Sequence, residues 1–206
     1  MNPRTPDTWE CRYVARELPE RFLHPAISSV LRTDYELLAS ELCETDDYLL
    51  ARTAELNIKI RHRSNSLKLK SLRAIAPDRL ECWRTDFDQK LPAPSRMWRE
   101  TLRLLECDSE PMDWLHVRCA EGIVKSLRRY LPDRRIVRVD KLRALYGEAG
   151  VRIEVAQFAV GGQHFGTLCV ESEDPARVRE VLARLATVEL GRPCNYIEVL
   201  HESTRY

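Results

Sequence analysis

The chain has 206 residues, of which 44% are hydrophobic, and its 33 lysines and arginines are balanced by 32 acidic residues. That hydrophobic content is ordinary for a folded globular protein, while the balanced charge excludes a global basic field that would attract nucleic acid or an anionic membrane. Any preference for anions must therefore come from local clusters of basic residues.

The amino-terminal stretch MNPRTPDTWE lacks the apolar core of a signal peptide. No run in the chain approaches the ~18 consecutive apolar residues of a transmembrane helix. We therefore expect a cytoplasmic protein with no membrane partner. The seven cysteines form neither a CxxC pair nor a group at zinc-ligand spacing, so reduced and mostly buried thiols are the expected state.

The chain begins with a short strand pattern at residues 8–16, in which the large apolar side chains alternate with charged ones. A helical pattern follows from about residue 19 to residue 42, with a break near Asp34. The stretch DDYLLA, residues 46–51, is typical of another strand. LNIKIR at 56–61 and LKLKSL at 67–72 then flank the polar turn RSNS, so they predict a hairpin.

From Ala93 the apolar spacing becomes that of helices, and PAPSRMWRETLRLLEC and PMDWLHVRCAEGIVKSLRRYL predict two of them. Strand patterns return in RIVRVDKLRALY, VRIEVAQFAV and GTLCVESE, which are joined by glycine-containing turns. A helix that starts at Asp174-Pro175 and a short terminal helix in PCNYIEVLHES complete the pattern. Without repeats or flexible linkers, the chain predicts one α+β domain over residues 1–206, an antiparallel sheet covered by helices, with a helical segment at about 93–131.

The charges of the predicted hairpin are of one sign. Its lysines and arginines are Lys59, Arg61, Arg63, Lys68 and Lys70, with no acid among them. Residues two apart in a strand share a face, so these side chains lie opposite the apolar ones. A solvated outer face is one interpretation, but in a charge-balanced chain such a face is expected to mix signs. The pattern therefore favours an anion-binding face.

The carboxy-terminal strands add cations and then a pair of carboxylates. The cations are Arg138, Lys141, Arg143 and Arg152. Glu171 and Glu173 follow, two residues apart, either as solvent-facing acids or as oxygen ligands that share a divalent cation. Because arginine and lysine form charge-assisted hydrogen bonds with phosphate oxygens, cations in several strands next to a carboxylate pair suit a phosphate chain.

The order of these features resembles the CYTH superfamily, the triphosphate tunnel metalloenzymes, which includes thiamine triphosphatases, inorganic triphosphatases and class IV adenylate cyclases. LNIKIR matches the Arg/Lys-rich strand of that family, SLKLK its lysine strand, VDKLR its K-x-R strand and TLCVESE its late E-x-E strand. DPARVREVLARLA and NYIEVL are similar to its closing helix and terminal element. The resemblance implies an antiparallel β-barrel covered by helices, with the charged faces turned into its lumen.

The resemblance also implies roles for individual residues. The implied substrate-binding cations are Lys59, Arg61, Lys68, Lys70, Lys141, Arg143 and Arg152. Glu171, Glu173 and Glu10 are the implied ligands of Mg²⁺ or Mn²⁺. This chain departs from the family at the amino-terminal E-x-E-x-K strand, which here has Glu10, Arg12 and Val14, so a cation replaces one acid and the lysine is absent.

The leading hypothesis is a metal-dependent hydrolase of a triphosphate or polyphosphate, with water as the nucleophile. A noncatalytic module of the same fold that binds an anionic ligand or a partner protein is the alternative, and Arg12 would then form a salt bridge in the lumen where a metal is otherwise bound. RNA along the basic strands is a less favoured partner than a phosphate-rich small molecule.

Overall fold

The computed structural model describes residues 6–16, 25–107, 117–131, 135–185 and 192–204. Within these ranges the strands are β1 (Thr8–Arg16), β2 (Glu36–Leu49), β3 (Leu56–Arg61), β4 (Ser66–Ile75), β5 (Glu81–Lys90), β6 (Ile136–Glu148), β7 (Val151–Val160), β8 (Gln163–Ser172) and β9 (Arg192–Pro193). The helices are α1 (Pro25–Asp34), α2 (Ser95–Leu104), α3 (Ala120–Leu127), α4 (Pro175–Leu185) and α5 (Tyr196–Ser203).

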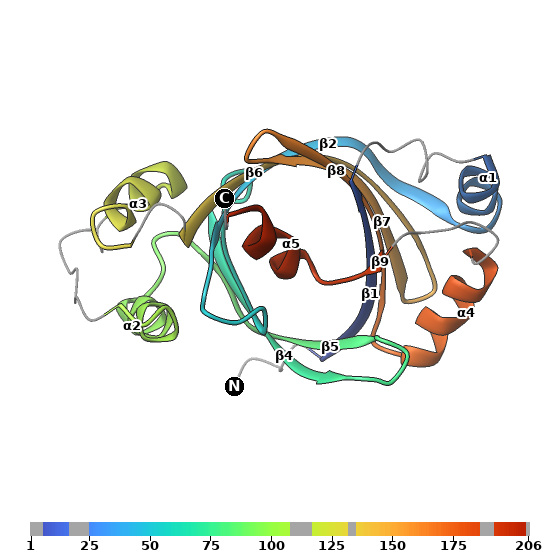
Figure 1. The fold of residues 1–206 in the computed structure, drawn as a ribbon, viewed down its shortest axis with the longest axis horizontal. Coiled ribbons are helices and arrows are strands. Elements are labelled where there is room, and N and C mark those ends of the chain that lie inside the picture. Colours follow the sequence, from blue (N-terminus) through green and yellow to red (C-terminus); the bar gives the residue numbers. More distant parts are fainter. Residues whose placement is uncertain (1–5, 17–24, 108–116, 132–134, 186–191, 205–206) are drawn as a thin grey trace.

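Eight of the described strands form a closed antiparallel barrel in the order β5-β4-β3-β2-β6-β7-β8-β1 (Figure 1). Pairing of Thr8 to Glu10 of β1 with Glu81 to Trp83 of β5 closes the ring, and β9 pairs with β1 as a short addition. A closed barrel leaves no unpaired sheet edge between its first and last strands. The predicted antiparallel barrel is confirmed.

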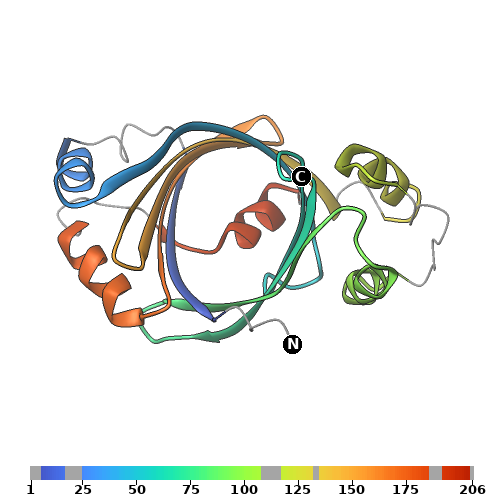
Figure 2. The same cartoon turned by 180° about the vertical axis from the view of Figure 1, so that it is seen from behind.

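Helices cover two opposite sides of the barrel, as Figures 1 and 2 show, with α2 and α3 on one side and α1 and α4 on the other. The outer faces of β3 and β4 carry Ile58, Ile60, Leu67 and Leu69, which share one buried core with residues of α2 and α3. The predicted alternation of the hairpin is therefore present in its strands: the apolar side chains pack against helices, while Lys59, Arg61, Lys68 and Lys70 turn inward. Arg63, in the turn, is exposed.

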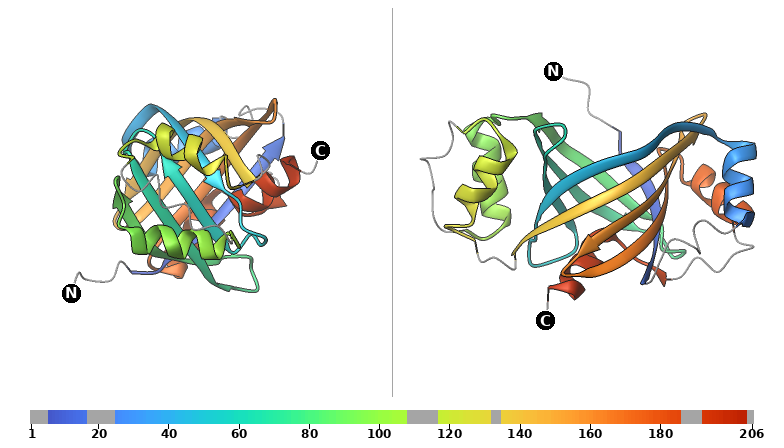
Figure 3. Two further views of the ribbon diagram at one scale, coloured as in Figure 1. Left: turned by 90° about the vertical axis from the view of Figure 1, so that its left-hand side faces the viewer. Right: turned by 90° about the horizontal axis from the view of Figure 1, so that it is seen from above.

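The helix α5 lies within the ring of strands in Figure 1, and Figure 3 places it at one end of the barrel. A capping box begins it, because the Asn195 side chain accepts from the Glu198 backbone N–H and the Glu198 side chain accepts from the Asn195 backbone N–H. Its Tyr196 and Ile197 pack against Tyr48 and Phe158 in a third core cluster. The described helices include none that is both long and apolar enough to cross a membrane.

Two elements differ from the sequence prediction. Residues 36–42 were predicted as helix but belong to β2, which pairs with β6 over most of its length, with two register shifts and a positive φ at Glu41. Cross-strand pairing therefore overrides the helical spacing of ELLASEL. The strand β5 was not predicted, because charged residues occupy five of its ten positions, and it forms by pairing with β4 and β1.

The remaining elements lie close to their predicted positions. The hairpin forms β3 and β4, and the three carboxy-terminal strands form β6, β7 and β8. In the region predicted as helical, about 93–131, the structure has α2 and a second helix that starts only at Ala120. Residues 19–24 and 111–116 of the predicted helices lie outside the described ranges.

Candidate functional site

A cavity of about 170 Å³ lies in the barrel lumen, and each of the eight barrel strands contributes at least one side chain to its lining. Of the described residues, eight lining side chains are cationic: Arg12, Lys59, Arg61, Lys68, Lys70, Lys141, Arg143 and Arg152. Four are carboxylates: Glu10, Glu44, Glu154 and Glu171. The seven cations implied as substrate-binding therefore meet in one cavity, and the cations outnumber the acids there.

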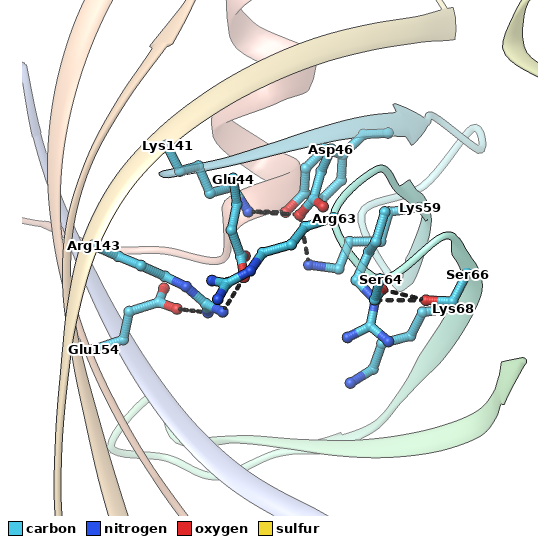
Figure 4. A network of polar contacts seen from close by, with 12 residues as sticks. Glu44, Asp46, Lys59, Arg63, Ser64, Ser66, Lys68, Lys141, Arg143 and Glu154 are labelled. Carbon is cyan, nitrogen blue, oxygen red and sulfur yellow. Dashed lines mark hydrogen bonds and ion pairs between the residues drawn. The ribbon is translucent and has the colours of Figure 1, made fainter. Parts of the chain in front are cut away.

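A buried carboxylate from β2 holds two of these lysines. Asp46 Oδ2 accepts hydrogen bonds from Lys59 Nζ at 2.9 Å and from Lys141 Nζ at 3.1 Å (Figure 4). Burial alone would raise the pKa of Asp46, but attraction to the two lysines outweighs burial and lowers that pKa. Lys141 Nζ also donates to Tyr48 Oη at 2.6 Å. Both lysines are thus fixed in orientation from one side of the lumen.

A second, partly buried carboxylate joins Arg12 to Arg143. Glu154 Oε1 accepts from Arg12 Nη1 at 3.1 Å, and Glu154 Oε2 accepts from Arg143 Nη1 at 2.7 Å. Arg12 Nη1 also donates to Thr167 Oγ1 at 3.2 Å, and Arg143 Nη2 donates to Glu44 Oε1 at 2.7 Å. Burial would raise the pKa of Glu154, but the nearby cations outweigh it and lower that pKa. The expected salt bridge of Arg12 within the lumen is confirmed.

The residues predicted as metal ligands do not lie together as a group of three. Glu10 and Glu171 are direct cross-strand partners on β1 and β8, and both line the cavity. Glu173 follows the end of β8, is exposed, and is not part of the described lining. Within β8, the residue that shares the lumen face with Glu171 is Cys169, whose cross-strand partner is Arg12. Their role as metal ligands stays a prediction.

This donor set fits Mg²⁺ or Mn²⁺ poorly. Glu10 Oε2 lies 3.3 Å from Lys70 Nζ, and Glu171 pairs with Arg152, so both carboxylates already have a cationic partner. Burial raises the pKa of the Cys169 thiol far above its ordinary range, which keeps it neutral, and a neutral thiol is a poor ligand for these oxygen-preferring ions. No cluster of three or more metal-binding side chains occurs in the part of the chain that the structure describes.

Of the four lysines that line the cavity, Lys68 lies farthest from its carboxylate partner. Its Nζ lies 3.7 Å from Asp88 Oδ2, and Asp88 is also 2.5 Å from Arg61 Nη2. Burial, followed by repulsion from Lys70 and Lys59, lowers the pKa of Lys68 to about 8. An anion in the cavity would relieve that repulsion.

Several residues of the cavity were not predicted from the sequence. Glu44 and Tyr48 line the cavity from β2, with the buried Asp46 between them, but the helix predicted just before them concealed the start of that strand. Glu154 was not predicted as a site residue because the sequence does not show that β7 and β1 flank β8, which brings Glu154 beside Arg12. Tyr196 comes from α5, and its ring lies 4.6 Å from Lys141 Nζ. Alternation in ETDDYL is the signal that could have revealed the β2 residues.

Comparison with known proteins places the fold but gives no relative of close sequence. No family model and no curated protein matches the chain. Solved structures match across nearly the whole chain: a conserved hypothetical protein from Pyrococcus furiosus has 17% identity and a TM-score of 0.53, covering 93% of this chain and 98% of that one. A Pyrococcus horikoshii OT3 protein has 14% identity and a TM-score of 0.52, covering 92% and 98%. A Bacillus halodurans protein named "putative adenylate cyclase" has 11% identity and a TM-score of 0.50, covering 95% and 98%.

Proposed function

Because the chain has the CYTH-like, triphosphate-tunnel fold, we propose that its lumen binds a phosphate-rich small molecule. The observation that carries the proposal is the meeting of eight cationic side chains with only four lining carboxylates in one cavity. Arginine and lysine along several strands can form charge-assisted hydrogen bonds with successive phosphate groups. The shape of the site supports a small molecule over RNA, since the cations face an enclosed lumen and α5 lies at one end of it.

Binding without catalysis is the function that the geometry supports best. The two positions that would complete a carboxylate cluster beside Glu10 and Glu171 hold Arg12 and Cys169. An arginine there supplies a fixed positive charge, and a neutral thiol supplies no ligand oxygen. Phosphoryl transfer depends mainly on positioning and on charge stabilisation at the reacting phosphorus. Arg12 and Cys169 stand where carboxylates would bind the metal that supplies this stabilisation, so they disfavour the metal-dependent reaction.

Metal-dependent hydrolysis of a triphosphate or polyphosphate is the second candidate. The observation in its favour is the direct opposition of Glu10 and Glu171, because Mg²⁺ is commonly held by one or two carboxylates together with substrate phosphates. For Mg²⁺ or Mn²⁺ to bind there, Lys70 and Arg152 would have to leave these carboxylates.

A screen of ligands tests the proposal and separates the two candidates. Inorganic tripolyphosphate, nucleoside triphosphates and thiamine triphosphate are added to the protein with EDTA, Mg²⁺ or Mn²⁺, and the melting temperature and phosphate release are measured. We expect stabilisation by at least one triphosphate, since a ligand that binds only the folded state raises stability by mass action. Stabilisation by mixed-sequence RNA alone would contradict the proposal, and metal-dependent phosphate release would establish the second candidate.

A further inference from the structure

We infer that Arg12, Arg143 and Tyr196 form an oxyanion subsite that takes one phosphate group of the tunnel ligand without a divalent metal. The inference rests on the proposed function, because it assumes that a phosphate-rich molecule enters the lumen. It adds where one phosphate group lies and which atoms bind it.

Three hydrogen-bond donors of these residues lack an acceptor. Arg12 Nε, Arg143 Nε and Tyr196 Oη are all buried, and none has a hydrogen-bond partner within the described residues. Buried donors are rarely left unpaired in folded proteins, because each lost water contact must be replaced. All three residues line the same cavity. A ligand that supplies acceptor oxygens in this part of the lumen would satisfy them after the guanidinium and hydroxyl groups turn toward the cavity, because the three atoms have almost no accessible surface before it binds.

The three residues belong to one connected group. Glu154 accepts from both guanidinium groups, which fixes Arg12 and Arg143 on either side of one carboxylate. The ring of Tyr196 lies 5.5 Å from Arg12 Cζ and 4.6 Å from Lys141 Nζ. Thr167 accepts a further hydrogen bond from Arg12, so the guanidinium is oriented before any ligand arrives.

The two guanidinium groups favour an anionic oxygen over a neutral acceptor, because hydrogen bonds between charged groups are the stronger ones. The charge around them is otherwise close to balanced, since Arg12, Arg143 and Lys141 lie near Glu154, Asp46 and Glu44, and Glu10 also attracts Arg12. Arginine matches phosphate geometry with parallel N–H donors, which a lysine cannot provide. The positive charge that a bound metal would give to a phosphate is already present in Arg12, and a divalent cation beside that guanidinium would be repelled.

Calorimetric titration of the full chain with inorganic tripolyphosphate, in EDTA and in excess Mg²⁺, tests the inference. We expect the wild type to bind in EDTA. Arg12→Gln should weaken binding by about tenfold or more, because it removes charged donors to the ligand. Glu154 keeps Arg143 as its partner in that variant, which favours folding.

The sharper variant is Tyr196→Phe. It keeps the ring contacts with Tyr48 and Phe158 and removes only a hydroxyl that has no partner in the described protein. The melting temperature should therefore not fall, while the affinity for tripolyphosphate in EDTA should fall about fivefold. This variant decides the question even if Arg12→Gln does not fold.

Two controls lie outside the cavity. Arg179→Gln removes an arginine of α4 that pairs with Asp78, and Tyr35→Phe removes a hydroxyl that interacts with Arg184. Neither should change binding. Wild-type binding only in Mg²⁺, or unchanged affinity in either folded variant, Arg12→Gln or Tyr196→Phe, would overturn the inference and leave the proposed function standing. No binding of any triphosphate in either buffer would instead overturn the proposed function.

Discussion

Two walls of the lumen differ in how their charges are compensated. The hairpin wall, from β3 and β4, consists of Lys59, Arg61, Lys68 and Lys70. The mixed wall, from β1, β7 and β8, consists of Glu10, Arg12, Arg152, Glu154, Cys169 and Glu171. The mixed wall contains its own pairs, Arg12 with Glu154 and Arg152 with Glu171, whereas every counterion of the hairpin wall comes from another strand.

This difference indicates that the two walls contribute differently to anion binding and to the stability of the fold. Burial, followed by repulsion from Lys70 and Lys59, lowers the pKa of Lys68, so this wall gains stability when an anion binds. The mixed wall is close to neutral and holds its guanidinium groups in fixed positions through carboxylates. We therefore expect both walls to contribute to the affinity for anions, the hairpin wall through relief of repulsion and the mixed wall through the oriented donors of Arg12. We expect the pairs of the mixed wall to contribute more to the stability of the folded protein.

The largest expected effect comes from breaking a pair of the mixed wall. Glu154→Gln leaves Arg12 and Arg143 without their shared carboxylate, which is 18% exposed. We expect the free energy of unfolding, measured by urea denaturation, to fall by about 3–5 kcal/mol. Tripolyphosphate should restore more stability in this variant than in the wild type, because it replaces the lost negative charge.

The matched control for this change is Glu180→Gln. Glu180 forms exposed pairs with Arg177 and Arg184 on α4, so the free energy of unfolding should change by less than about 1 kcal/mol. A similarly small loss in Glu154→Gln would show that solvent screens the mixed wall and would remove the contrast between the walls.

The second effect concerns the hairpin wall and pH. The pKa of Lys68 is lowered to about 8, so the folded protein holds fewer protons than the unfolded chain between pH 8 and about pH 10.5. Wild-type stability should therefore rise over that interval relative to Lys68→Met. At pH 7 we expect Lys68→Met to be more stable by an amount on the order of 2 kcal/mol, as measured by denaturation.

The same substitution should weaken tripolyphosphate binding by about tenfold, because it removes one charged donor. The control is Lys125→Met, at an exposed position of α3, which should change the free energy of unfolding by less than about 0.5 kcal/mol both at pH 7 and at about pH 10.5. If Lys68→Met destabilised the protein at pH 7, the charge of Lys68 would not be unfavourable in the folded state, which would contradict its lowered pKa.

A third, smaller effect is expected where β5 meets the mixed wall. Glu81 is the cross-strand partner of Glu10 and accepts hydrogen bonds from Trp83 Nε1 and Asn195 Nδ2. Burial raises the pKa of Glu81 to about 7, so its contribution to stability is complete below about pH 4.5 and is lost as pH rises through 7.

The Glu81→Gln variant stays neutral and should lack this slope. With allowance for solvent screening, we expect the wild type to lose about 1 kcal/mol relative to the variant between pH 4.5 and pH 8, as measured by thermal unfolding at each pH. Parallel stability curves for the two proteins would show that Glu81 is ionised throughout this range in the folded state.

The smallest expected effect separates Glu171 from Glu173. Glu171→Gln removes the partner of Arg152 in the lumen, so tripolyphosphate should bind a few times more tightly as that cation becomes free. Glu173→Gln changes an exposed residue beyond β8, so binding should stay the same and stability should change by less than about 0.5 kcal/mol. If the wild type and Glu171→Gln released phosphate with a metal and Glu173→Gln did not, Glu173 would act in the lumen. That result would contradict the placement of Cys169, and not Glu173, beside Glu171.

Much of the barrel could be predicted because β-strands have a side-chain period of two. That period in residues 56–72 placed the cations of the hairpin on one face, and the K-x-R spacing of Lys141 and Arg143 did the same in β6. The period does not tell where a strand ends. Glu171 and Glu173 have the correct spacing to share a face, but β8 ends at Ser172, so only Glu171 lies in the lumen with Cys169.

The sequence alone determined that the cations of each strand share a face, because alternation is a local property of an extended backbone. Only the tertiary structure decided which way those faces turn and which carboxylates neutralise them. Lys141 meets Asp46 across 95 positions of sequence, and Arg12 meets Glu154 across 142. Such pairs form because closure of the barrel brings distant strands around one lumen, where buried charges need partners whatever their separation along the chain.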